Sequence, residues 1–160
     1  MELSELVRQV MRHWASGVAV VTSRAGDIRH GMTVNSFTSV SLDPPIISLS
    51  LAHQTRTIAL IRETGSLAVT FLSAEQQSIS EIFAGRTPED ADRFAGLETY
   101  TLISGAPLLA GGLAALDCKV IFQYPMATST LFLAEVLAVS HLREGQPLIY
   151  FNRGYQRLAT

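Results

Sequence analysis

Hydroxyl and amide side chains gather between two strongly apolar runs of this chain, Gly17 to Val21 and Ile46 to Leu51. Most of this polarity lies in residues 31–45, which read GMTVNSFTSVSLDPP. Polar side chains in the middle of a strand-rich core need hydrogen-bonding partners, and a bound ligand is one candidate to supply them. The double proline at positions 44 and 45 cannot lie inside a sheet, so it should end this segment. The pattern makes residues 31–45 the first candidate for a binding site.

The hydrophobic pattern predicts a chain built mainly from short strands. Several such strands with only two or three helices favour a β-barrel or sandwich over an alternating doubly wound sheet. No repeat or linker divides the chain, so we expect a single domain over residues 1–160. The predicted helices are 3–14, 58–63 and 74–83, and the predicted strands are 18–23, a return strand through His30, 46–51, 67–72, 113–124, 130–141 and 147–151.

The helix predicted at 58–63 has a polar start. Thr55, Arg56 and Thr57 precede its apolar residues, and Gly65 stands where a helix terminator belongs. Free backbone N–H groups, two hydroxyls and a guanidinium at a helix N-terminus make a credible phosphate site. The alternative is that a threonine simply caps its own helix.

A charged, proline-broken loop is predicted at residues 84–96. It is longer than an ordinary connection, which is typical of a functional or a mobile loop. Arg86 is its best candidate for binding an anion, and a solvated surface arginine is the alternative.

Composition narrows the function classes. With 160 residues, 48% of them hydrophobic and 16% charged, the chain can bury a substantial core. A net charge of -2 without a basic run gives no footprint for nucleic acid. The N-terminus is acidic and no apolar run approaches a membrane span, so we expect a cytoplasmic protein that binds neither nucleic acid nor membrane.

Familiar catalytic motifs are missing from the sequence. It has no Gly-x-Ser-x-Gly, His-Glu-x-x-His, Gly-x-Gly-x-x-Gly or Walker pattern. Its single cysteine, Cys118, is expected to be buried packing. The histidines at 13, 30, 53 and 141 are widely spaced, so nothing supports a metal site, and His53 before the predicted cap is the one of most interest.

Six segments taken together resemble the short-chain flavin reductases, over roughly residues 10–158. The resemblance implies a mainly β fold, a split β-barrel with Greek-key connections, that forms a homodimer with flavin near the subunit interface. It also implies NAD(P)H-dependent reduction of FMN, or alternatively FAD, often to supply a separate flavin-dependent monooxygenase. The segments are GVAVVT at 17–22, residues 31–45, Thr55-x-Thr57, FAGR at 83–86, RFAG at 93–96 and PLIY at 147–150.

The resemblance also assigns roles to residues. By this resemblance the flavin ring would be lined by Thr33, Val34, Asn35 and Ser36 and flanked by Ser50, Leu51 and Ala52. The phosphate would be held by Arg56 and Thr57. Gly85 and Arg86 would lie near the phosphates of the flavin or of the dinucleotide. Because a flavin carries the electronic part of hydride transfer, the protein mainly positions two rings, and no protein group is predicted to be catalytic.

One motif departs from the family. Many of these reductases carry Gly-Asp-His before the strand that begins near Thr130, and its histidine is associated with the nicotinamide substrate. This chain has Ala127, Thr128 and Ser129 there. Three alternatives follow. Ser129 takes the place of this histidine in contacting the nicotinamide, or His13 or His53 reaches the nicotinamide site from elsewhere. Otherwise the protein binds flavin with weak or no NAD(P)H reductase activity. A third reading, haem in the same barrel, has no well-placed histidine to support it.

Overall fold

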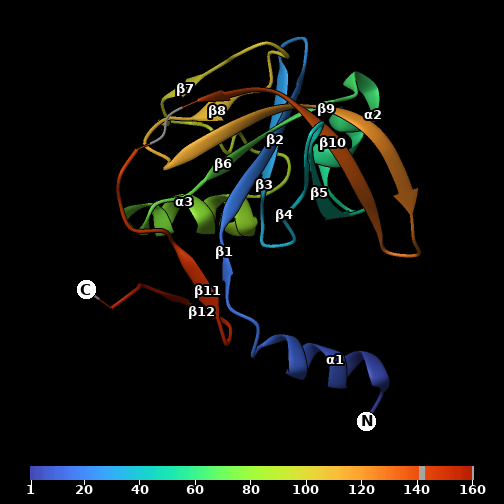
Figure 1. The fold of residues 1–160 in the computed structure, drawn as a ribbon, viewed down its shortest axis with the longest axis vertical. Helices are drawn as coiled ribbons and strands as arrows, with labels where there is room; N and C mark the ends of the chain where they lie inside the picture. The colour runs from blue at the N-terminus through green and yellow to red at the C-terminus, as the bar shows by residue number, and fades with distance from the viewer. Residues whose placement is uncertain (141–142, 160) are drawn as a thin grey trace.

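The computed structural model describes residues 1–140 and 143–159. Its largest element is a seven-stranded antiparallel sheet with the strand order β3-β2-β6-β9-β10-β5-β4 (Figure 1). The prediction of a mainly β chain is confirmed. The strands of this sheet are β2 (Ala19–Ala25), β3 (Ile28–Val34), β4 (Thr38–Leu42), β5 (Pro45–Ala52), β6 (Ser66–Phe71), β9 (Ala114–Pro125) and β10 (Ser129–Ser140).

Two small sheets and the helical segments surround the large sheet. In Figure 1 the N-terminal helix stands away from it, and the C-terminal hairpin lies between the two. The small sheets are β1 (Ser16–Gly17) with β11 (Ile149–Phe151) and β12 (Gly154–Gln156), and β7 (Thr99–Tyr100) with β8 (Leu108–Leu109). The helical segments are α1 (Leu3–Met11), α2 (Arg56–Thr64), η1 (Ala74–Gln76), α3 (Gln77–Glu81) and η2 (Ile82–Arg86).

The sheet is covered on both faces around β2. Side chains alternate along a strand, so Ala19 and Val21 enter one core while Val18 and Val20 enter another. The first core also takes residues from β3, which is one end of the strand order, and from β10 and β5, of which β5 is next to the other end. The sheet is therefore curled around this core, and burial on both faces explains the unbroken apolar run at 18–21.

The edges of the sheet are β3 and β4. No pairing joins these two strands among the described residues, so hydrogen bonds between them do not close the curl. The expectation of buried polarity is wrong for residues 38–40, which are exposed, because β4 is an edge strand. Their polar side chains face water and need no ligand.

Helix α2 begins and ends as predicted. Thr55 is its N-cap, and the Thr55 hydroxyl accepts a hydrogen bond from the Ile58 N–H at 3.4 Å. Gly65 ends it with φ +69°, a left-handed conformation that suits glycine. The helix packs against β2 and β3. Its N-terminus therefore opens beside the edge strand that carries the first half of the polar segment.

Two predicted helices differ in extent. The N-terminal helix stops at Met11, short of residue 14. The helix predicted at 74–83 is a run of 3-10, α and π turns through Arg86, with Gly85 at φ +112°. The strand predicted at 130–141 is β10, which runs to Ser140, and His141 lies outside the described residues.

A search of the described residues finds no helix with the length and apolar character to cross a membrane. Nor do they hold a group of histidine, cysteine, aspartate and glutamate side chains placed to bind a metal.

Candidate functional site

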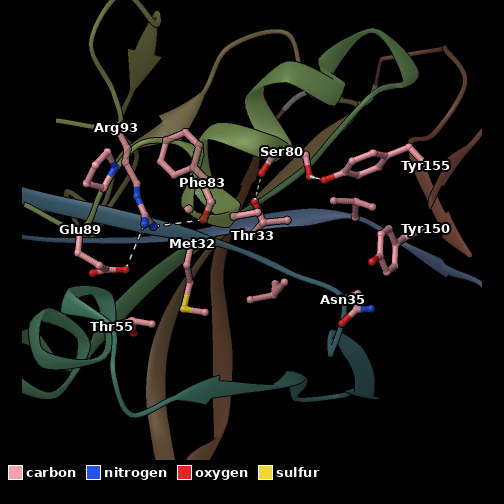
Figure 2. A pocket seen from close by; sticks show the side chains of 15 residues that line it. Met32, Thr33, Asn35, Thr55, Ser80, Phe83, Glu89, Arg93, Tyr150 and Tyr155 are labelled. Carbon is pink, nitrogen blue, oxygen red and sulfur yellow. Dashed lines mark hydrogen bonds and ion pairs between the residues drawn. The ribbon is translucent and has the colours of Figure 1, made fainter. Parts of the chain in front are cut away.

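A cavity of about 520 Å³ runs along β3, from the N-terminus of α2 to the C-terminal hairpin (Figure 2). This volume lies within the range of pockets that hold cofactors. Its two ends differ in chemistry, and its middle is largely apolar. The lining residues are Val18, Met32, Thr33, Val34, Asn35, Thr55, Ser80, Phe83, Ala84, Gly85, Pro88, Glu89, Arg93, Tyr150 and Tyr155.

One end of the cavity is built from ionised groups. Arg93 is 5% exposed, and one of its nitrogens lies 3.2 Å from the Glu89 carboxylate. The same guanidinium donates to the carbonyl oxygens of Thr87, Gly31 and Phe83 at 2.9, 3.0 and 3.2 Å. These bonds fasten the loop after η2 to β3, because a buried guanidinium needs acceptors for all of its donors.

The N-terminus of α2 meets the same carboxylate. The Arg56 backbone N–H donates to Glu89 Oε2 at 2.9 Å, and the Arg56 guanidinium donates to the Glu89 carbonyl at 3.0 Å. A helix N-terminus attracts negative charge, since its first N–H groups lack partners within the helix. The structure thus places an internal anion where the sequence predicts phosphate.

His30 is buried behind this carboxylate. Its Nδ1 lies 2.8 Å from the Thr57 hydroxyl, and its Nε2 lies 3.4 Å from Glu89 Oε2. Burial lowers the pKa of His30, and the nearby charges of Arg93 and Arg56 lower it further, while Glu89 raises it. The Thr57 side chain is therefore committed to His30 and does not face the cavity.

A chain of hydroxyl groups lies along one wall of the cavity. The Thr33 hydroxyl donates to the Ser80 carbonyl at 2.6 Å, and the Ser80 hydroxyl lies 2.7 Å from the Tyr155 hydroxyl. Tyr155 in turn meets Tyr150 edge to face at 5.6 Å between ring centroids. These contacts join β3, α3 and the C-terminal hairpin, and Figure 2 shows them along one wall of the cavity.

Asn35 stands at the other end, after the last residue of β3. It is exposed, and it also lines two neighbouring clefts of about 830 and 270 Å³. The larger of these runs past Trp14, Phe37 and Leu148. An amide at a junction of three clefts can donate to and accept from a ligand that enters from any of them.

Glycine is required where β3 meets η2. A Cβ built on Gly31 would lie 3.0 Å from the Phe83 ring, from the Thr22 methyl and from the Val21 carbonyl oxygen. Gly85, with its left-handed φ, leaves the cavity wall without a side chain at that point. Gly31 thus allows β3 and η2 to pack closely, and Gly85 brings backbone close to the space where a ligand would lie.

The structure brings four of the predicted site residues to the cavity, and the others lie around it. Ser36 pairs with Ser50, since its hydroxyl donates to the Ser50 carbonyl and accepts from the Ser50 N–H, both at 3.0 Å. Leu51 is buried in the first core, and Ala52 is exposed at the end of β5. The four that line the cavity are Thr33, Val34, Asn35 and Gly85.

Three further candidates lie away from the cavity wall. Arg86 is exposed and pairs with Glu81 at 3.0 Å. Ser129 is opposite Ala52 in the register of β10 with β5, and His13 is exposed after α1. His53 is near Ser129. Its ring nitrogen Nε2 lies 3.0 Å from the Thr130 hydroxyl, and its backbone N–H donates to the Thr128 carbonyl.

Sequence reasoning gave no role to several residues that build the cavity. Glu89, Arg93, Ser80 and Tyr155 all line it. Tyr155 follows Gly154 in a short strand that was not predicted, so no pattern pointed to it. Cys118 is buried as expected, and burial raises the pKa of its thiol to about 12, which leaves it unreactive.

The cavity suits a flat ligand with an anionic end. Its carboxylate is already ion-paired, and its hydroxyls bond to one another or to backbone, so it offers positioning groups rather than a strong base. Flavin mononucleotide has this shape, an extended aromatic ring with a polar edge and a phosphate at the far end. The residues present fit such a group.

Comparison with known proteins agrees with this chemistry. Residues 11–159 match the model of the flavin reductase like domain. The chain is 33% identical to the reductase component of 4-hydroxyphenylacetate 3-monooxygenase from Thermus thermophilus, covering 98% of this chain and 97% of that protein. It is 35% identical to a NADH-dependent flavin reductase from a Rhodococcus species, over 95% and 85% of the two chains.

A solved structure of a flavin-dependent oxidoreductase is also similar to this chain. The NADH:FAD oxidoreductase SgcE6 of Streptomyces globisporus C-1027, in complex with NAD and FAD fragments, superposes with a TM-score of 0.89. It is 30% identical to this chain and covers 98% of it, with 93% of its own length matched. The match over nearly the whole length, with the same fold and a cavity of suitable chemistry, establishes that this chain belongs to the flavin reductase family.

Proposed function

We propose that the protein is an NAD(P)H-dependent flavin reductase, which transfers a hydride from NADH or NADPH to FMN, or alternatively FAD. The observation that carries this proposal is the cavity along β3, which joins an apolar middle to an end built from ionised groups in a chain of this family. A bound flavin supplies the hydride acceptor, so the protein needs no nucleophile of its own.

In this proposal the chain's residues hold the flavin in place. Thr33, Val34 and Asn35 lie along the ring, and the pair formed by Ser36 and Ser50 fixes the loop beside it. The phosphate lies at the N-terminus of α2, close to the Arg56 guanidinium and the Thr57 N–H. Leu51 and Ala52 contribute backbone, and Gly85 with Arg86 borders the phosphates.

The nicotinamide contact is proposed on the hairpin that lacks the family's Gly-Asp-His. Ser129 is there, and His53 is fixed beside it by Thr130 and Thr128. His13 is the other candidate, since the cleft that contains Met11 and Trp14 shares Asn35 with the cavity. Orienting the nicotinamide against the flavin ring would be the task of these groups.

We also propose a setting for the reaction. The chain would act as a single-domain homodimer in the cytoplasm and deliver reduced flavin to a partner monooxygenase. The Thermus thermophilus relative, the reductase component of a monooxygenase, supports such a partner. Exposed apolar side chains on α1, among them Leu6 and Val10, support a second copy as their cover.

Anaerobic titration tests the activity. Purified protein with FMN is mixed with NADH, and separately with NADPH, in the absence of oxygen. We expect the yellow colour of the flavin to bleach at a rate proportional to the enzyme concentration. A protein that binds FMN without any bleaching by either nucleotide would instead be a flavin-binding relative without reductase activity.

Asn35 offers a test of the site. Asn35→Ala should weaken FMN and riboflavin binding by roughly tenfold each, because the loss of a ligand hydrogen bond costs about 1.5 kcal/mol. The fold should remain intact, since the residue is exposed. Flavin fluorescence titration measures the affinity and circular dichroism the fold. A variant that unfolds would show that Asn35 is structural.

A further inference from the structure

The Glu89 carboxylate occupies a cradle built for an anion. One oxygen accepts from the backbone N–H of the first residue of α2 at 2.9 Å, and the other lies 3.2 Å from the Arg93 guanidinium. The Arg56 side chain is held against the same residue through the Glu89 carbonyl. A helix N-terminus and the Arg93 guanidinium thus converge on one carboxylate, and the Arg56 guanidinium lies beside them on the carbonyl of the same residue. Such a set of donors binds a phosphate.

A second observation points the same way. His30 is 2% exposed, and its Nε2 has no hydrogen-bond partner among the described residues, although it faces Glu89 Oε2 at 3.4 Å. Buried polar nitrogens are nearly always paired, and in the tautomer that carries its proton on Nε2 this nitrogen has no acceptor, because the carboxylate forms no hydrogen bond with it. An anion with more oxygens, placed slightly deeper, would satisfy it.

The carboxylate can leave without unfolding its loop. The Glu89 side chain is 39% exposed and lines the cavity, so solvent and ligand reach it from one side. Arg93 keeps its three carbonyl acceptors on Thr87, Gly31 and Phe83 when the carboxylate departs. The Arg56 N–H, by contrast, is freed for another anion.

We propose that Glu89 is an internal counter-anion that the phosphate of FMN must displace from the N-terminus of α2. Glu89 is then a residue that sets the preference of the site for phosphorylated over unphosphorylated flavin, and it keeps that preference low. This inference rests on the proposed flavin reductase function. It accounts for a site that neutralises its own cations when empty.

Two flavins that differ only in the phosphate test the proposal. FMN and riboflavin are titrated into wild type, Glu89→Gln and Asp90→Asn, and the dissociation constants are measured from flavin fluorescence. The control removes the same charge from the adjacent, exposed residue of the loop. In Glu89→Gln we expect FMN to bind roughly tenfold tighter and riboflavin to bind within twofold of wild type. Asp90→Asn should leave both constants within twofold.

The outcomes separate this proposal from the function on which it rests. FMN affinity that is unchanged or weaker in Glu89→Gln, or equal gains for both flavins, overturns it, as does the same gain in Asp90→Asn. Failure of the wild type to bind any flavin would instead refute the proposed function. If Glu89→Gln does not fold, Glu89→Asp shortens the carboxylate and should give a smaller gain that is likewise confined to FMN.

A spectroscopic measurement adds a direct readout. In wild type, the backbone amide signal of Arg56 should shift on addition of FMN and stay in place on addition of riboflavin, because only the phosphate replaces the carboxylate. In Glu89→Gln the signal of the free protein should already differ from wild type. An Arg56 signal that FMN leaves unmoved would show that the carboxylate stays in place, which contradicts displacement.

Discussion

His30 ties the stability of the site to pH. Its imidazole is buried between Thr57 and Glu89, and burial with the nearby Arg93 and Arg56 lowers its pKa below the usual 6.5, against the opposing charge of Glu89. The unfolded chain, with an ordinary histidine, therefore binds the proton more readily than the folded chain does. The stability from this group is fully present above the unfolded pKa and is lost as the pH falls towards the folded one.

We therefore expect the melting temperature of the protein to fall as the pH is lowered from 7.5 to 5.5. One proton difference changes the unfolding free energy by at most about 1.4 kcal/mol per pH unit. His30→Gln should show a smaller fall over the same range, and His13→Gln, which removes an exposed imidazole, should follow wild type. Equal pH slopes for wild type and His30→Gln would contradict this role. Scanning calorimetry across the pH range measures the slopes.

Single residues also mark the limit of prediction from sequence. The cap at Thr55 and the stop at Gly65 follow from local rules, and both are confirmed. Thr57 was assigned to phosphate because it follows the cap, yet its side chain turns inward to His30. No feature of the sequence identifies Glu89 as a site residue, since an acidic residue in a charged loop is usually solvated. Which way these side chains point is decided by tertiary packing.

At the scale of an element, the loop of residues 87–96 depends on Arg93. The guanidinium joins this loop to η2 and to β3 through three carbonyls and one ion pair. Arg93→Gln should destabilise the protein by about 3–5 kcal/mol, because it leaves the three buried carbonyl acceptors without their donors and removes the ion pair with Glu89. Urea unfolding at neutral pH measures the change.

Arg86→Gln is the matched control for Arg93→Gln. Arg86 belongs to the preceding turn and also carries an ion pair, but that pair, with Glu81, is exposed. Its loss should cost no more than about 1 kcal/mol. Similar losses for the two variants would mean that Arg93 does not anchor the loop.

The strands were predicted better than their surroundings. The β-branched run of β2 is read reliably because both of its faces are covered, and β5 is read from apolar residues that alternate onto one buried face. The polarity of residues 38–40 was misread as buried, because edge position depends on the pairing of β4 with β5 alone. The break of the helix after residue 81 depends on a left-handed Gly85, which the helical spacing of apolar residues cannot reveal.

At the scale of the whole molecule, helix α1 buries none of its side chains against the rest of the chain. Helix α1 contributes no buried residue, although its apolar side chains recur on one face, and Trp14 beyond it is 70% exposed. Exposed apolar residues in such a stripe are typical of an interface. This uncovered face supports the proposal that a second copy of the chain covers α1.

Val10→Asp tests this arrangement. Val10 is 67% exposed on α1, so in a single chain the aspartate would remain in water and leave the core intact. In a dimer that buries the helix, the unpaired charge would cost several kcal/mol and drive the dimer apart. Size-exclusion chromatography with light scattering should show a dimer for wild type and half that mass for Val10→Asp, with unchanged circular dichroism. Ile28→Asp should remain dimeric, because Ile28 is 54% exposed at the start of β3, and the turn between β2 and β3 lies far from α1 in Figure 1. A dimeric Val10→Asp would place the interface on another face, and the apolar end of β9, where Ile121 and Phe122 are exposed, would then be the next to substitute.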